Sequence, residues 1–366
     1  MSDKILQTRK RITKSGITLN NASKRYDCVV LFAPMFGSGE VYAINTDGNI
    51  VHEWKLPWSP GLYGYLLPNG NLLYLGKTTK KSEVDFPFWE RFKGGIIAEV
   101  DKDSNIISKY EDIYHHHDAQ WLPNGNLLYT AAAQLVTSKY ALKPNTLYSD
   151  VVKEVNRKGE VVWEWKIWEH IDPRRLPSHD IFDNSHWPMI NGLCQTSDEL
   201  VLMSLRTTSG IIAVNKSTDE IAWHIQYPRV AQQHCPVETG KNKFLCFDNG
   251  NVRPGISTTH SRIVEFNVDY YADASPFIDK IWSYIDPMPP SFFSPYMGSV
   301  QRLWNGNTFV CESAFGRLFE ITPEGEIVWE YVIPDFAEYP APLNEFITGK
   351  HNSCFKAFRY EGVEWL

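Results

Sequence analysis

A unit of two short apolar strands joined by a turn occurs six times along the 366 residues of this chain. The copies cover residues 39–54, 95–110, 150–165, 210–225, 262–284 and 316–331. In five of them the same interval separates the first residue from the first apolar residue of the second strand, as in Gly39 to Ile50 and Gly95 to Ile106. β-Branched and aromatic residues around Asp-Gly, Lys-Gly and Glu-Gly steps are typical of β-hairpins. The constant spacing indicates one supersecondary unit that has been copied.

A second turn precedes some of these hairpins. Leu-Pro-Asn-Gly-Asn-Leu-Leu-Tyr stands at 67–74 and again at 122–129, with a divergent version at 303–308. The Asn-Gly step predicts a type I′ turn between two further strands. Each unit then holds four strands, which is the number in one blade of a β-propeller.

The register of the repeats predicts how the ring closes. The chain begins in the middle of a unit, because residues 29–34 and the first hairpin supply three strands with none before them. His351 to Tyr360, after the last hairpin, supplies the missing strand. We therefore predict an all-β, six-bladed propeller with four antiparallel strands per blade, closed by pairing of the C-terminal strand with the N-terminal blade. Residues 26–366 form this single domain, and residues 1–25 are a polar, basic N-terminal arm.

Composition excludes some classes of partner. The net charge of −7 and the pI near 5.9 disfavour a nucleic acid, whose partners carry a basic face. The sequence has no apolar run of membrane length, and its first 25 residues lack the apolar core of a signal peptide, so we expect a cytoplasmic protein without a membrane partner. Six scattered cysteines without a C-x-x-C pair indicate reduced thiols. The sequence does not encode the oligomeric state.

Histidines fall where a propeller places its central site. The first strand of each blade lines the channel, so the starts of these strands meet at one mouth. These positions are near Leu62, His117, residues 186–189, His234, Gly298 and His351. One histidine alone is more often a hydrogen-bonded core residue, but several from distant segments are how catalytic and metal sites are assembled.

The side chains from His115 to Asp118 cannot all point to the same side, because alternate residues of a strand face opposite sides. If His117 faces the channel, we expect His115 on the same side. His116 and Asp118 then point into the blade, where Asp118 could orient a neighbouring group.

Two arginines follow inner segments, Arg206 in Ser204-Leu205-Arg206 and Arg262 after Ser261. A guanidinium group matches two oxygens of a sulfate or phosphate at once. The alternative for each is an ion pair between blades.

These blocks together resemble the arylsulfotransferase family, the type that uses a sulfate ester as donor and needs no nucleotide (PAPS-independent). The resemblance runs across nearly the whole chain and follows the order of the blocks in the family. The matching blocks are His116-His117-Asp118 with residues 122–126, Ser204-x-Arg206, Gln233-His234 with residues 247–250, and Ser261-Arg262.

The resemblance implies that a central histidine takes a sulfuryl group from an aryl sulfate and passes it to a phenol, without a cofactor. His234 matches that nucleophile, while His117 and Arg206 match the groups that bind the sulfuryl oxygens. Neutral imidazole is a competent nucleophile near neutral pH, and transfer in two steps gives ping-pong kinetics. The remaining candidates are His186, His351 and Asn191 for catalysis, and Arg262, His116 and Trp187 for contacts with a small aromatic substrate.

One block departs from the family pattern. The family carries His-x-Asn before the Ser-x-Arg strand, whereas Met189 stands two residues before Asn191 here. Either His186 reaches the same space, or an acid/base group is lost and the scaffold does different chemistry.

Two alternatives follow. The first is a metal-assisted lyase, hydrolase or carbon–carbon bond-forming enzyme, in which His117, His186, His234 and His351 ligate a divalent metal. The second is a non-catalytic, ligand-binding propeller. Acceptor specificity is expected in the loops 77–93, 131–149 and 286–297.

Overall fold

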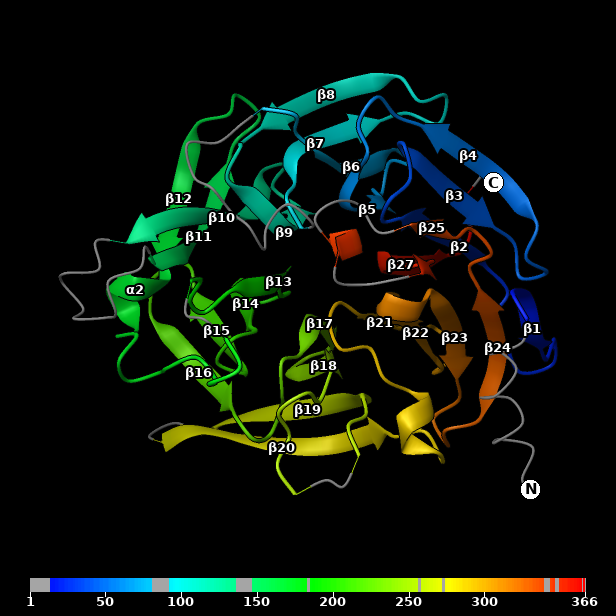
Figure 1. The fold of residues 1–366 in the computed structure, drawn as a ribbon. Coiled ribbons are helices and arrows are strands. Elements are labelled where there is room, and N and C mark those ends of the chain that lie inside the picture. Colours follow the sequence, from blue (N-terminus) through cyan, green and yellow to red (C-terminus); the bar gives the residue numbers. More distant parts are fainter. Residues whose placement is uncertain are drawn as a thin grey trace.

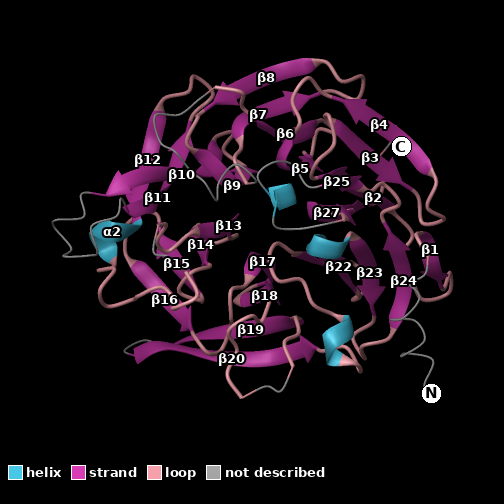
Figure 2. Cartoon of the chain, viewed as in Figure 1, coloured by secondary structure: helices cyan, strands magenta, loops and turns pink. Residues whose placement is uncertain are grey.

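The computed structural model describes residues 14–80, 92–135, 147–182, 185–255, 258–271, 274–338, 343–345, 349–363 and 365. Across these residues six antiparallel sheets stand around a central axis (Figure 1). Strands dominate and helices are few and short, the α-helix α2 having only Ile167–His170 (Figure 2). The structure confirms the all-β, six-bladed propeller.

The strands run outward from the axis in each blade. The first blade is β27(Cys354–Tyr360), β2(Val29–Pro34), β3(Glu40–Ile44) and β4(Ile50–Lys55); the second is β5(Pro60–Leu66), β6(Leu72–Lys77), β7(Gly95–Val100) and β8(Ile106–Glu111). The third is β9(His115–Trp121), β10(Leu127–Leu135), β11(Leu147–Val155) and β12(Val161–Lys166); the fourth is β13(Ile190–Gln195), β14(Leu200–Leu205), β15(Gly210–Asn215) and β16(Ile221–Gln226). The fifth is β17(His234–Gly240), β18(Lys243–Asp248), β19(Arg262–Tyr271) and β20(Ala274–Tyr284); the sixth is β21(Ser299–Arg302), β22(Thr308–Glu312), β23(Arg317–Ile321) and β24(Ile327–Val332).

The ring closes as the sequence predicts. β27 pairs with β2 from Val29↔Tyr360 to Pro34↔Cys354, so the first blade combines the C-terminal strand with strands from the N-terminal part of the chain. The closing strand is shorter than expected, because His351 lies outside it. His351 belongs to the short strand β26(Lys350–His351), which pairs with β25(Ala337–Glu338).

Part of the expected N-terminal arm is a strand. β1(Gly16–Asn20) pairs antiparallel with β24 and gives the sixth blade a fifth, outermost strand. Thr18 adds a hydrogen bond of 2.6 Å from its hydroxyl to Glu330. Residues 1–13 of the arm lie outside the described part of the chain.

The Leu-Pro-Asn-Gly-Asn turns are not of type I′, and that prediction is wrong. In the first of them Gly70 has a φ of 82°, whereas Asn69 is not in the left-handed region. The Gly70 N–H donates to Leu67 O over 2.9 Å and the Leu67 N–H donates to Asn71 O over 2.8 Å, which makes a type I turn with a glycine bulge. The reason is Pro68, whose ring holds φ near −65° where a type I′ turn needs a positive angle.

Tryptophans at the ends of outer strands join neighbouring blades. Trp54, Trp165 and Trp329 are almost fully buried. Their indole N–H groups donate to Asp101 O, Asp219 O and Thr46 O of the next blade over 3.0, 3.0 and 2.8 Å. Each ring therefore fills the space between two blades while its single polar atom is satisfied. This packing holds neighbouring blades in place around the axis. None of the described helices is long and apolar enough to cross a membrane.

Candidate active site

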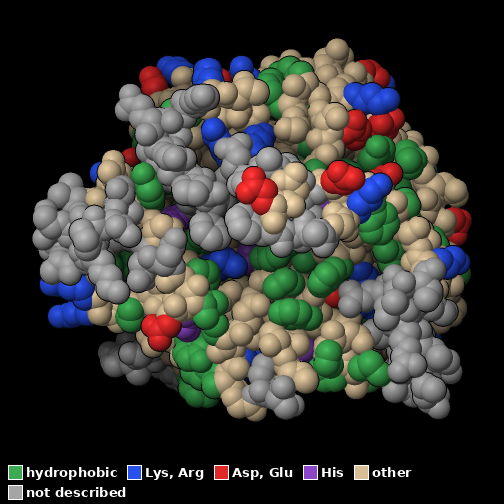
Figure 3. Space-filling model, viewed as in Figure 1, with side chains coloured by type: hydrophobic (Ala, Val, Ile, Leu, Met, Phe, Trp, Pro, Cys, Tyr) green, Lys and Arg blue, Asp and Glu red, His purple; other side chains and the backbone are tan. Residues whose placement is uncertain are grey.

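Strained backbone marks one mouth of the channel. Non-glycine residues with positive φ lie within two residues of the starts of four successive inner strands: His117 at 55°, Met189 at 61°, Cys235 at 52° and Met297 at 59°. Such angles are uncommon outside glycine and concentrate at functional sites. In the view down the axis, histidine and Lys or Arg atoms show near the middle of the ring, close to a group of hydrophobic side chains (Figure 3).

His234 begins β17 and lies buried at this mouth. Burial, followed by the charge of Arg206, lowers its pKa to about 3, so the imidazole is neutral near pH 7. Its Nδ1 lies 2.7 Å from Asn249 Oδ1, and its Nε2 accepts a hydrogen bond of 3.2 Å from the Met297 N–H.

Asn249 determines the tautomer of His234. The Asn249 Nδ2 donates to two carbonyl oxygens, Ser294 O at 2.7 Å and Met297 O at 2.8 Å. Because the amide nitrogen is committed to acceptors, the amide oxygen faces the imidazole and accepts its Nδ1 proton. The lone pair of His234 is therefore on Nε2. Asn249 is not among the site residues predicted from the sequence, although it belongs to the block Phe247-Asp248-Asn249-Gly250.

His117 shares the mouth with His234. Burial, then the neighbouring His116 and His234, hold the pKa of His117 well below its usual range. The ring stacks on Phe92 with centroids 5.3 Å apart and meets Phe355 edge-on at 6.0 Å. The structure thus places His117 against an aromatic wall and within electrostatic reach of His234.

Arg206 is the cation of the site. Burial lowers its pKa to about 10, and no carboxylate among the described residues lies within ion-pair distance of it. The guanidinium instead lies 5.1 Å from the Phe182 ring, and its Nη1 is 3.8 Å from Met189 Sδ. Met189, where the family has a histidine, therefore contacts the arginine with a weak acceptor. A partly buried cation without a carboxylate partner among the described residues is suited to binding an anion.

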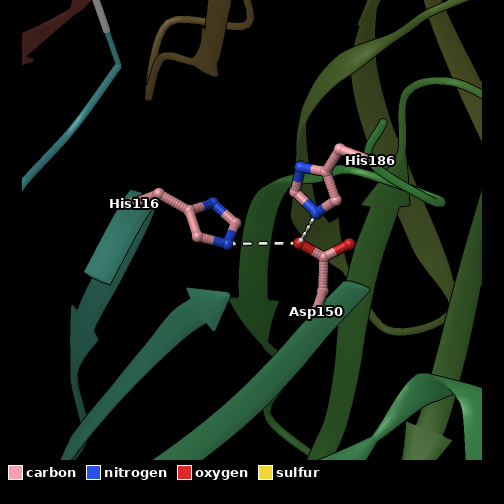
Figure 4. A group of neighbouring side chains, drawn as sticks. All are labelled: His116, Asp150 and His186. Atoms are coloured by element: carbon pink, nitrogen blue, oxygen red, sulfur yellow. Dashed lines mark hydrogen bonds and ion pairs between the residues drawn. The ribbon is translucent and has the colours of Figure 1, made fainter. Parts of the chain in front are cut away.

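A carboxylate and two imidazoles form a second group beside His117 (Figure 4). Asp150 Oδ1 lies 2.8 Å from His186 Nε2 and 3.1 Å from His116 Nε2, and Asp150 Oδ2 accepts the Ile190 N–H over 3.0 Å. His116 Nδ1 faces His117 Nδ1 at 2.8 Å. Burial opposes ionisation of Asp150, but His186 and His116 hold its pKa below the usual range. His186 is thus hydrogen-bonded to Asp150 and His116 to His117, while His116 Nε2 lies at ion-pair distance from Asp150 without hydrogen-bond geometry.

The same three side chains are the ones whose ligand atoms converge as a metal would require, all within 4.8 Å among the described residues. Of the four histidines in the metal alternative, only His186 belongs to this group. A divalent ion here would take the Nε2 atoms of His116 and His186 and one oxygen of Asp150. The metal alternative remains a prediction with this changed ligand set.

Asp118 does not point into its blade, and that expectation is wrong. Its carboxylate accepts the Tyr63 hydroxyl, the Leu193 N–H at 2.8 Å and the Lys356 ammonium at 2.7 Å, from the second, fourth and first blades. Lys356 belongs to a blade that is not adjacent, so the pair spans the channel. The cause is a bulge at His117, where the register with β10 shifts and the alternation of side chains breaks.

Three other candidates lie in different surroundings. Arg262 donates to Asp248 Oδ2 at 2.7 Å and to a backbone carbonyl, so its guanidinium is used in an ion pair within the fifth blade. Trp187 packs in the core of the third and fourth blades and donates its N–H to Leu176 O over 2.6 Å. His351 Nδ1 is 2.9 Å from Ser353 Oγ.

Asn191 lies between the fourth and fifth blades. It is fully buried, and its Nδ2 donates to Gln233 O over 2.9 Å, directly before His234. Within the described part of the chain its Oδ1 has no hydrogen-bond partner. Asn191 therefore supports the backbone that carries the nucleophile candidate. Residues 81–91 and 136–146 of the expected specificity loops lie outside the described residues.

The fold and the site define a six-bladed propeller protein with a buried histidine and arginine centre at its channel mouth. A model of the arylsulfotransferase family (ASST) matches residues 108–231 and 228–333, which is more than half of the chain. The chain belongs to the arylsulfotransferase family, as the sequence blocks indicated. No curated protein matches it.

One of the similar solved structures shows the same kind of fold. A protein of unknown function from Bacteroides caccae is similar with a TM-score of 0.53 and 14% identity, over 84% of this chain and 94% of that one. A catalytically inactive virginiamycin B lyase from Staphylococcus aureus with quinupristin gives a TM-score of 0.48 and 12% identity, over 88% and 89% of the two chains. At such identities the likeness concerns the fold.

Proposed function

We propose that this protein transfers a sulfuryl group from an aryl sulfate ester to a phenol through a sulfohistidine formed on His234. The observation that carries the proposal is the tautomer of His234, because a neutral imidazole with its lone pair on Nε2 is the form that can attack sulfur. Membership of the arylsulfotransferase family supports the same reaction class.

In the first half-reaction His234 Nε2 attacks the sulfur atom of the donor. The N–S bond forms, the S–O bond to the aryl group breaks, and the aryloxide leaves with the electron pair. The hydrogen bond from the Met297 N–H to Nε2 must open first, and its length of 3.2 Å makes it the weaker of the two bonds that hold the ring. The bond from Nδ1 to Asn249 Oδ1 stays and stabilises the charge that develops on the ring.

Arg206 is assigned to the sulfuryl oxygens. Its partly buried guanidinium has no carboxylate partner among the described residues, so its donors are available to an anionic ligand. Away from water, such donors stabilise the charge on the transferring group more strongly than they would in solvent.

The aromatic wall beside His117 is assigned to the aryl group. Phe92 and Phe355 lie near the imidazole, and Tyr296 extends the wall with its centroid 6.4 Å from that of Phe92. Flat rings of this kind stack on a phenyl group, and the same surface serves the donor and then the acceptor. Donor and acceptor would then occupy one site in turn, which is compatible with the ping-pong kinetics of a covalent intermediate.

The test is transfer from p-nitrophenyl sulfate to phenol by wild type, His234→Gln and His224→Gln. His224 is matched because it lies on the outer strand β16 of the fourth blade. We expect transfer to be abolished in the first variant and kept in the second. Wild-type turnover by His234→Gln would contradict the proposal. Binding of aryl sulfates without turnover by the wild type would favour the ligand-binding propeller.

A further inference from the structure

We infer that Asp150, acting through His116, sets which nitrogen of His117 carries the proton and so makes His117 Nε2 the proton acceptor for the incoming phenol. The inference rests on the proposed function. It makes Asp150, His116 and His186 positioning residues. His117 is the residue that contacts the aromatic wall, where the substrate is assigned.

The carboxylate of Asp150 directs the histidine protons. It is fully buried, and within the described part of the chain its oxygens contact the Ile190 N–H, His186 Nε2 and His116 Nε2. An ionised carboxylate only accepts hydrogen bonds. His186 Nε2 is hydrogen-bonded to Asp150 Oδ1 and must therefore carry a proton. His116 Nε2 lies at ion-pair distance from the same oxygen but outside hydrogen-bond geometry, and there the buried negative charge favours the tautomer with its proton on Nε2.

The tautomer of His116 determines the tautomer of His117. With its proton on Nε2, neutral His116 has its lone pair on Nδ1. That atom faces His117 Nδ1 at 2.8 Å, and one of two such nitrogens must donate to the other. His117 is the donor, so its proton is on Nδ1 and its lone pair is on Nε2.

The lone pair gives the second half-reaction a base. The phenol oxygen attacks the sulfur of sulfohistidine, the S–O bond forms, and the N–S bond to His234 Nε2 breaks with its electron pair returning to the imidazole. The phenol proton moves to His117 Nε2. In the next cycle His117 returns this proton to the leaving aryloxide, so atoms and charge balance over one turnover. The chain to Asp150 stabilises the positive imidazole that exists between these steps.

This role differs from the one that the family resemblance gave to His117. A nitrogen that holds a lone pair cannot donate to a sulfuryl oxygen. Arg206 then binds the sulfuryl oxygens. His117 acts as the base, a role for which the His-x-Asn histidine of the family is missing here.

The test compares wild type with Asp150→Asn and with a matched control, Asp112→Asn. Asp112 lies in the loop before β9, where Lys153 pairs with it at 3.0 Å. In Asp150→Asn one amide oxygen and one NH₂ group replace the two carboxylate oxygens. If it accepts the Ile190 N–H, the amide N–H groups face the histidines and reverse the tautomers of His116 and His117.

Nitrogen-15 NMR of histidine-labelled protein reads the tautomers directly. We expect wild type and Asp112→Asn to show His117 protonated at Nδ1 and unprotonated at Nε2, and Asp150→Asn to lose this pattern. Protonation of His117 at Nε2 in the wild type would overturn the inference even if no variant folds. Stoichiometric metal in untagged wild type, lost in Asp150→Asn, would overturn it as well, because a metal would take both Nε2 lone pairs.

Kinetics separate this inference from the proposed function. Formation of the His234 adduct from p-nitrophenyl sulfate should change less than about twofold in Asp150→Asn, because nitrophenoxide leaves without a proton. Transfer from the adduct to phenol should fall about 100-fold, and less for nitrophenol acceptors. Equal transfer to phenol in both proteins would overturn the inference alone, whereas failure of the wild type to form any adduct would remove the proposed function.

Discussion

Asn249 accepts the Nδ1 proton of His234 over 2.7 Å while its own amide nitrogen is held by two backbone carbonyls. In the proposed mechanism, the attacking nitrogen of the histidine is thus selected by an asparagine that follows β18 and by the loop that leads to β21. The nucleophile candidate and its orientation depend on two neighbouring blades together.

Removal of that acceptor should impair catalysis without unfolding the protein. In Asn249→Ala the His234 ring can take either tautomer and rotate, so we expect the rate of adduct formation to fall by about 100-fold. Rapid-quench mass measurement gives this rate. Asn156→Ala is the control, since Asn156 caps an exposed turn of the third blade. Equal rates in the two variants would show that the tautomer does not matter.

Arg206 and Arg262 should respond in opposite ways to replacement by methionine. Arg206→Met removes a partly buried cation that has no carboxylate partner among the described residues, so stability to urea should stay equal or rise while sulfuryl transfer is lost. Arg262→Met breaks the pair with Asp248 and should lower stability with transfer kept. Urea denaturation and transfer assays on both variants test these expectations. Loss of stability in Arg206→Met together with loss of transfer in Arg262→Met would contradict the roles assigned here.

The pH dependence of adduct formation follows from burial. The pKa of His234 falls from its ordinary 6.5 to about 3, so its neutral form persists as the pH is lowered. We expect the single-turnover rate to be flat between about pH 5 and about pH 8 and to fall only as the pH approaches 3. Unfolded histidines bind protons below about pH 6.5, so the folded state loses stability there and the assay must stay below the melting temperature. A rate midpoint near 6.5 would contradict the buried, neutral nucleophile.

The pair of Lys356 and Asp118 joins the closing strand to the third blade. Burial opposes the charge on Lys356, but Asp118 raises its pKa, so the ammonium stays ionised. Lys356→Met leaves a buried carboxylate without its cation, and we expect a loss of about 3–5 kcal/mol in the free energy of unfolding. Adding Asp118→Asn should restore part of it. Chemical denaturation measures both, with exposed Lys109→Met as the control, and a loss below 1 kcal/mol would contradict a channel-spanning role.

The repeat made the architecture predictable. Blade number, hairpin positions and closure follow from spacing between residues that are local in sequence, such as Gly39 and Ile50. Asn-Gly alone did not predict the turn type, because Pro68 fixes the φ angle one residue earlier.

The site was predictable only in part. Inner-strand starts identified His117 and His234, because a propeller brings those positions to one mouth. The side-chain partners were not predictable, since Asp150 lies on an intermediate strand of its blade and Asn249 in a loop. Alternation also failed at His117, where a bulge turns Asp118 toward the channel.

A site-mapped mass spectrum after a short exposure to p-nitrophenyl sulfate, before any phenol is added, tests the central claim most directly. We predict an adduct of about 80 daltons, one SO₃ group, on the peptide that carries His234, and its loss when phenol is added. An unmodified His234 in protein that transfers sulfuryl groups to phenol, or an adduct on another residue, would contradict the account.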